Sequence, residues 1–141
     1  MNQRLTYITL GVSDLEVMTS FYKEKFGWTP LKEMEGICFF KLNGIILALF
    51  PAKELAEDAG IPFQTAKWKQ MSFSINFNSE EEVDENIAAL KENGVSIIKT
   101  PQKVFWGGYS GYIEDPEANL WELAYNPFLE MDENWNVLGH Q

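Results

Sequence analysis

The sequence predicts an α+β fold made of two β-α-β-β-β modules, because its two halves repeat one pattern. Residues 7–12 and 72–77 each alternate apolar with other side chains, which is typical of a strand with one buried face. Each strand is followed by Ser-x-x-Glu, a sequence typical of a helix N-terminus, and then by a helical stretch that ends at Gly27 or Gly94. Both halves therefore begin with a strand and a helix.

The length of the chain limits the number of domains. With 141 residues, 45% of them hydrophobic and 14% aromatic, the chain can bury one ordinary core. We expect a single domain over residues 1–127, in which modules at about 4–51 and 69–127 share a core and residues 52–68 connect them. Residues 128–141 show no clear period and are expected to form a tail of loop or short helix.

The acidic composition bears on partners and location. The chain has 21 acidic and 11 basic side chains and a formal net charge of −10. Such a surface repels phosphate backbones and anionic lipids, so we expect no nucleic acid and no membrane partner. Cys38 is the single cysteine, and the first residues lack the apolar stretch of a signal peptide. A cytoplasmic location is therefore expected.

The first module contains one main helix. Its expected elements are a strand over 5–12, a helix over 14–26 and strands near 29–33, 37–42 and 45–50. Asn43-Gly44 predicts a hairpin between the last two strands, since both residues tolerate positive φ. After Pro51, residues 52–59 have helix-forming composition and Gly60 ends them, so the connection should contain a short helix.

The second module repeats the order. Its expected elements are a strand near 71–77, a helix over 80–92 and strands near 96–99, 108–114 and 120–125. The turn from Asp115 to Asn119 joins the last two strands, because Pro116 fixes φ and the Asp115 side chain can bond nearby backbone.

Two segments carry a resemblance to a known family. One is Leu10–Leu15 with Phe21-Tyr22 and Phe26–Trp28; the other is Gly111–Leu123 with Asn126-Pro127. Over residues 4–127 the chain resembles the vicinal oxygen chelate superfamily, which includes glyoxalase I, bleomycin-resistance proteins and extradiol dioxygenases. The resemblance implies paired βαβββ modules whose strands form a cup-shaped mixed sheet around a ligand, with helices on the outer face, and it implies a homodimer.

One departure from the family lies in the turn before the last strand. The family usually has glycine where Ala118 stands. We therefore expect the left-handed backbone position to move to Asn119, which tolerates it better than most residues.

The metal positions of the family are mostly lost. Four ligands, usually His, Gln or Glu, map onto Tyr7, Ala48, Ser72 and Glu122, given that alternate strand residues face the cup. A single carboxylate does not hold Fe(II), Zn(II) or Ni(II), and the one histidine, His140, lies in the tail. We expect no cofactor; a divalent ion (Zn, Ni, Fe or Mn) belongs to the alternative that the chain is a metal-dependent enzyme.

Glu122 and a glycine-rich aromatic segment remain as candidate site features. Glu122 is either a leftover carboxylate bonded to neighbouring Tyr or Ser hydroxyls, or the charged anchor or general base of an apolar cavity. In the segment 105–112, Trp106 and Tyr109 are expected to line the pocket, and Tyr112 to pack in the core.

The leading hypothesis is metal-free binding of a small apolar or aromatic molecule. The residues expected to bind it are Tyr7, Phe50, Ser72, Trp106, Tyr109 and Glu122. The alternatives are a metal-dependent lyase or dioxygenase similar to lactoylglutathione lyase, a metal-independent isomerase with Glu122 as base, and a scaffold whose cup is filled by its own side chains. Trp28 and Trp121 are expected to be structural, Trp68 to reach a dimer contact and Trp135 to pin the tail.

Overall fold

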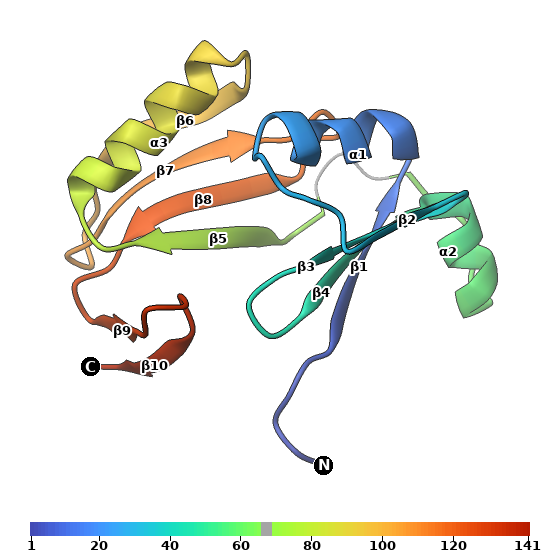
Figure 1. The fold of residues 1–141 in the computed structure, drawn as a ribbon, viewed down its shortest axis with the longest axis horizontal. Helices are drawn as coiled ribbons and strands as arrows, with labels where there is room; N and C mark the ends of the chain where they lie inside the picture. Colours follow the sequence, from blue (N-terminus) through green and yellow to red (C-terminus); the bar gives the residue numbers. More distant parts are fainter. Residues whose placement is uncertain (66–68) are drawn as a thin grey trace. The chain divides into compact units, whose positions relative to one another are not determined.

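A computed structural model describes residues 1–65 and 69–141 (Figure 1). The described residues form two four-stranded mixed sheets, one two-stranded sheet and three helices, which confirms the predicted fold class. The chain divides into two compact units, Met1–Ala66 and Lys67–Gln141. The dimer contact predicted for Trp68 lies outside the described residues. Within those residues, no helix has both the length and the apolar character needed to span a membrane.

The first unit consists of a four-stranded sheet in the order β1-β4-β3-β2 and two helices. β1 and β4 are parallel and the other neighbours antiparallel, with Gly44 at a φ of 100° in the β3–β4 hairpin. Its elements are β1 (Tyr7–Val12), α1 (Leu15–Glu24), β2 (Lys32–Met34), β3 (Ile37–Lys41), β4 (Ile46–Pro51) and α2 (Ala52–Ala59).

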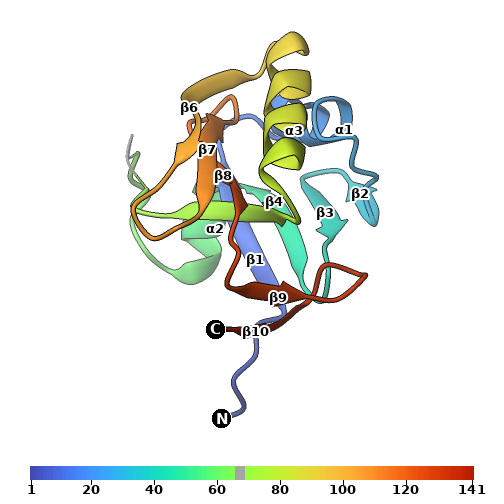
Figure 2. The same ribbon diagram turned by 90° about the vertical axis from the view of Figure 1, so that its left-hand side faces the viewer.

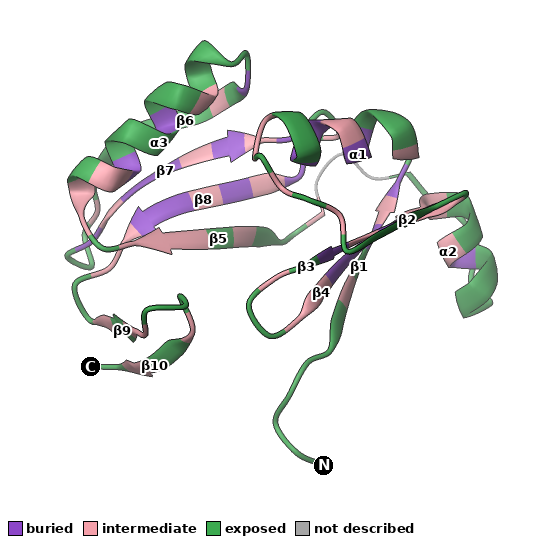
Figure 3. Cartoon of the chain, in the orientation of Figure 1, coloured by how far each residue is buried: buried purple, intermediate pink, exposed green. Residues whose placement is uncertain are grey.

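The core of the first unit lies between α1 and one face of this sheet. Leu10 and Val12 are buried whereas Tyr7 and Thr9 are exposed, so the predicted alternation of β1 is confirmed (Figure 3). Tyr22 of α1 is fully buried and stacks on the Trp28 ring at a centroid distance of 5.7 Å. The Tyr22 ring also meets Phe40 of β3 edge to face at 6.0 Å, so aromatic side chains hold the helix on the sheet.

The helix α1 begins one residue later than the Ser-x-x-Glu pattern implies. Asp14, in extended conformation, is the N-cap, and its carboxylate accepts a hydrogen bond of 3.0 Å from the Val17 amide. Asp and Ser are equally good caps, so a Ser-Asp pair leaves the start ambiguous by one residue. The assignment of the cap to Ser13 was wrong.

The short helix α2 has the predicted bounds and ends at Gly60, whose φ is +70°. A Cβ on Gly11 would lie 3.3 Å from Ala52 and from Leu55. Successive strand residues face opposite sides, so the Cβ position of Gly11 lies on the face opposite Leu10 and Val12. The helix α2 therefore packs on the face of β1 opposite α1. This helix belongs to the connection between the modules, where the sequence predicted it.

The second unit repeats the sheet in the order β5-β8-β7-β6, with β5 and β8 parallel. Its elements are β5 (Ser72–Phe77), α3 (Glu80–Glu92), β6 (Ser96–Lys103), β7 (Tyr109–Glu114) and β8 (Leu120–Tyr125). The helix α3 covers one face of this sheet in both views (Figures 1 and 2). Ser79 caps it by accepting from the Glu82 amide at 3.1 Å, as predicted, and Val83 and Ile87 are buried.

The turn between β7 and β8 keeps its left-handed residue at Ala118. The φ of Ala118 is +62°, and Asn119 is not in this conformation. One carboxylate oxygen of Asp115 accepts from the amides of Glu117 and Asn119, both at 2.9 Å. The expected shift to Asn119 is wrong, because these bonds fix the turn around Asp115 and Asn119 and leave Ala118 to bear the strain.

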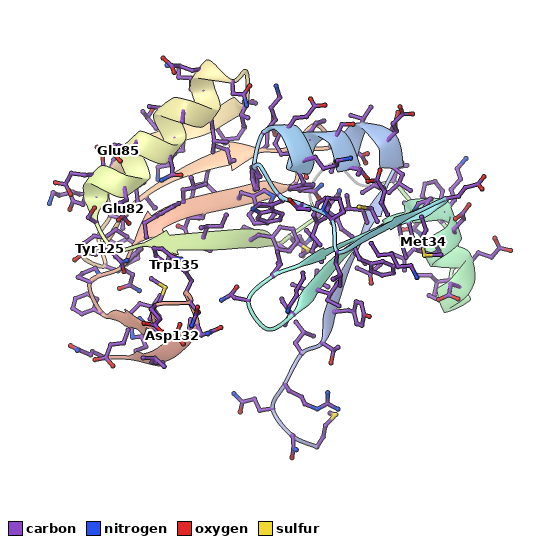
Figure 4. All side chains as sticks on the ribbon, viewed as in Figure 1. Met34, Glu82, Glu85, Tyr125, Asp132 and Trp135 are labelled. Carbon is purple, nitrogen blue, oxygen red and sulfur yellow. The ribbon has the colours of Figure 1, made fainter. Side chains whose placement is uncertain are left out.

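The tail is a β-hairpin, so the prediction of loop or short helix was wrong. β9 (Leu129–Met131) pairs antiparallel with β10 (Val137–His140). Asp132 accepts from the amides of Asn134 and Asn136, at 2.8 and 2.9 Å, and Trp135 has a φ of +65°. Asp132 and Trp135 are labelled in Figure 4. Trp135 is 46% exposed, so more than half of its surface is covered, and its role as a pin of the tail stays a prediction.

Candidate functional site

Three polar side chains lie side by side on neighbouring strands of the second sheet. Ser74 of β5 is in register with Glu122 of β8, and Glu122 is in register with Tyr112 of β7. Gly111 faces α3, since a Cβ there would lie 2.7 Å from Ile87. The next residue, Tyr112, therefore points to the other face, and Ser74 and Glu122 with it.

Glu122 accepts hydrogen bonds from both neighbours. The Ser74 hydroxyl lies 3.2 Å from Glu122 Oε1 and 3.3 Å from Asn76 Oδ1. The Tyr112 hydroxyl also bonds the Glu122 carboxylate; burial and this nearby carboxylate raise the pKa of Tyr112 above its usual value of 10.0. Tyr112 therefore stays a neutral phenol and a hydrogen-bond donor at neutral pH.

This arrangement presents a hydrogen-bond acceptor on an accessible sheet face. Glu122 is half-buried, and an ionised carboxylate has about four lone-pair sites, of which the two hydroxyls use two. The remaining sites can accept from an ammonium, amide or hydroxyl group of a ligand. The first interpretation of Glu122, a carboxylate bonded to Tyr and Ser hydroxyls, describes the bonds that are present. Because these bonds leave lone-pair sites unused, Glu122 can also serve as the anchor of a ligand.

Ser72, which was predicted to bind the ligand as Glu122 does, is not opposite Glu122 in the sheet. It is exposed and in register with Leu120, whereas Ser74 occupies the position opposite Glu122. The alternation of β5 places both serines on the same face, so the same pattern could have found Ser74. Only the register of the parallel β5–β8 pair separates them.

Tyr109 is not brought together with Glu122. The Tyr109 hydroxyl donates to Asp84 Oδ1 of α3 at 2.7 Å, so Tyr109 lies on the helix-covered face. This bond and the negative charge raise the pKa of Tyr109 to about 12. The indole of Trp106 lies over Gly108, where an added Cβ would be 2.0 Å from the ring. The bond to Asp84 thus accounts for the position of Tyr109, whereas Trp106 covers Gly108 and stays 37% exposed.

Tyr7 and Phe50 belong to the first unit. Both lie on the sheet face away from α1, where Gly11 is the register partner of Phe50. The rings of Tyr7 and Phe39 meet edge to face at 6.2 Å, and Tyr7 is 48% exposed. Ala48 on the same face is buried and pairs with Thr9. This face is therefore apolar and aromatic, while the face of Glu122 is polar.

The side chains around Glu122 do not match a transition-metal site. Ser74 and Tyr112 are neutral hydroxyls, which are poor ligands for such ions. Across residues 1–65 and 69–141, no three His, Cys, Asp or Glu side chains are grouped to hold an ion. His140 is the last residue of β10, and its Nε2 lies 3.3 Å from Asn126 Nδ2.

Comparison with known families agrees with the fold. The sequence model of the Glyoxalase/Bleomycin resistance protein/Dioxygenase superfamily matches residues 4–123. The chain belongs to this superfamily. The match covers the first module and the second as far as Leu123, which confirms the resemblance drawn from the two motifs.

Individual members of the superfamily are similar along most of the chain. A metallothiol transferase FosB of Staphylococcus saprophyticus is 29% identical over 125 residues, which cover 87% of this chain and 77% of that protein. The crystal structure of a glyoxalase-related enzyme from Fulvimarina pelagi has a TM-score of 0.89 at 31% identity, covering 99% of this chain and 100% of that one. A lactoylglutathione lyase from Agrobacterium tumefaciens has a TM-score of 0.71 at 26% identity, covering 89% and 95%.

Proposed function

We propose that this chain binds a small organic molecule on the open face of the second sheet, with the Glu122 carboxylate as its polar anchor and no resident metal. The observation that carries the proposal is the row Ser74–Glu122–Tyr112, in which two neutral hydroxyls hold the carboxylate. A ligand with a hydrogen-bond donor beside an apolar or aromatic body fits this row. Ser72, on the same strand as Ser74, stays a proposed ligand contact, and Tyr7, Phe50 and Trp106 stay predictions. Tyr109 loses support, because its hydroxyl bonds Asp84 of α3.

The test is ligand binding to metal-free protein. After dialysis against a chelator, a panel of aromatic amines, alcohols and carboxylates is titrated while the melting temperature and tryptophan fluorescence are recorded. We expect saturable binding of amines and alcohols, and a loss of roughly ten- to 150-fold in affinity in Glu122→Gln, the range for a hydrogen bond to a charged group. Glu85→Gln on the exposed side of α3 (Figure 4) is the matched control. Unchanged binding in Glu122→Gln would contradict the proposal.

A second candidate function is a metal-dependent transfer or lyase reaction. It is favoured by the names of the relatives, since metallothiol transferases match 84–89% of this chain at 28–29% identity. Elemental analysis of purified protein separates the two functions. Stoichiometric Zn, Ni, Fe or Mn that is lost in Glu122→Gln would establish the second function and overturn the first.

A further inference from the structure

A separate pocket of about 280 Å³ lies in the first unit, between α1 and the strands β2 and β3. Its floor is formed by Cys38 and Thr19, both buried, whose side chains are hydrogen-bonded to each other. Burial raises the pKa of the Cys38 thiol above 9.0, so the floor is uncharged at neutral pH. The volume is near the lower end of ligand pockets, roughly 300 Å³, and suits a molecule with one small ring or a short chain.

The walls of this pocket combine apolar surface with negative charge. Leu15, Met34 and Ile37 supply the apolar surface. Glu16 and Glu33 also line the pocket; Glu33 pairs with Lys23 at 3.2 Å, whereas no ion pair of Glu16 is formed in the described part of the chain. The net charge of −10 adds a long-range attraction for cations.

We infer that this pocket is a second binding site, which takes a small organic monocation with an apolar body. The ammonium or guanidinium group pairs with Glu16 near the mouth, and the hydrocarbon part packs on Leu15, Met34 and Ile37. An anion of the same shape is disfavoured, because it meets two carboxylates and no unpaired cation among the lining residues. The site lies in a different unit from Glu122 and does not depend on the function proposed above.

Three probes of one size test the inference: benzylamine, benzyl alcohol and benzoate. The reporter is the alkylation rate of Cys38 by N-ethylmaleimide, followed by mass spectrometry, because Cys38 is the only cysteine in the chain. A bound molecule slows alkylation whether the reagent enters through the pocket or through local opening of the fold. We expect saturable protection by benzylamine, weaker protection by benzyl alcohol and none by benzoate. Equal protection by all three probes, or by none, overturns the inference.

Two variants locate the effect. Glu16→Gln removes the charge from an exposed side chain, and should weaken benzylamine protection about two- to fivefold, as expected for an exposed ion pair. Met34→Lys places a cation on the apolar wall and should abolish protection. Glu57→Gln, at an exposed position of α2 far from both proposed sites in the sequence, should match the wild type. Wild-type protection in Glu16→Gln and Met34→Lys, or its loss in Glu57→Gln, overturns the inference.

Discussion

At the scale of single residues, Ala118 holds a backbone conformation that suits glycine. Its φ of +62° is fixed by the bonds that Asp115 makes on either side of it. A left-handed conformation costs a residue with a Cβ about 1–2 kcal/mol. We predict that Ala118→Gly raises the free energy of unfolding by about 1 kcal/mol, measured by urea denaturation.

The control for this substitution is an alanine in a regular helix. Ala88→Gly, at an exposed position in the middle of α3, should lower the free energy of unfolding by about 1 kcal/mol. If both substitutions destabilise the protein, Ala118 is not strained.

Tyr109 offers a second measurement on one side chain. Its hydroxyl bond to Asp84 favours the neutral phenol and raises the pKa of Tyr109 to about 12. A raised pKa means that the contribution of this bond to stability is complete below pH 10 and is lost as the pH rises toward 12. We predict that Asp84→Asn brings the pKa of Tyr109 closer to 10, measured by near-ultraviolet absorbance titration. An unchanged titration curve would show that Asp84 does not act on Tyr109.

At the scale of elements, Gly111 sets the distance between α3 and its sheet. A Cβ at this position would lie 2.7 Å from Ile87, 2.8 Å from the Lys99 carbonyl oxygen and 3.0 Å from the Pro101 nitrogen. The Ile87 side chain can turn aside, but the backbone of β6 cannot. We predict that Gly111→Ala lowers the free energy of unfolding by about 1–3 kcal/mol. Gly139→Ala, which meets only the Glu130 carboxylate at 3.9 Å, should be close to neutral; a similar loss in both variants would contradict this explanation.

The conformation of the loop in the tail hairpin, at Asp132–Asn136, should depend on pH. Hydrogen bonds from the Asn136 side chain and amide lower the pKa of Asp132 below 3.8. A lowered pKa means that the contribution of Asp132 to stability is present above its unfolded-state value and is lost as the pH falls through the folded-state value. We predict that the Asn136 amide signal in NMR spectra stays unchanged down to about pH 4 and shifts only below it. Asp132→Asn should remove this acid transition, and its persistence in that variant would assign it to another carboxylate.

Local signals in the sequence predicted most elements, and non-local pairing explains most of what they missed. The bounds of α2 and α3 follow from glycine and serine at their ends, and the β3–β4 hairpin follows from Asn43-Gly44. Ser74 was missed as the partner of Glu122, because the register of two parallel strands is set by the sheet and not by the nearby sequence. Tyr109 was assigned to a pocket from its own segment alone. Its hydrogen-bond partner Asp84 lies 25 positions away, so the nearby sequence could not reveal it.

At the scale of the whole molecule, the homodimer implied by the family is a prediction. The mass of one chain is 16.2 kDa, so sedimentation equilibrium should give about twice this value at micromolar concentration if the chain pairs as we expect. Glu16→Gln and Glu122→Gln should give the same mass by sedimentation equilibrium as the wild type. Each substitution removes only one accessible charge and keeps the size of the side chain. A single-chain mass at all concentrations would show that the dimer is not a property of this protein.

The two Asp-x-x-x-Asn loops, at Asp115–Asn119 and Asp132–Asn136, have a consequence for protein design. In each loop the first aspartate binds the amide of the last asparagine, and the fourth residue has a positive φ, although the residues between differ. These bonds lie inside a five-residue segment, and the Asn119 side chain of the first loop also accepts from Lys69 Nζ at 2.7 Å. The segment should therefore be transferable: the loop at Asp132–Asn136, grafted between two antiparallel strands of an unrelated protein, should direct the chain to reverse.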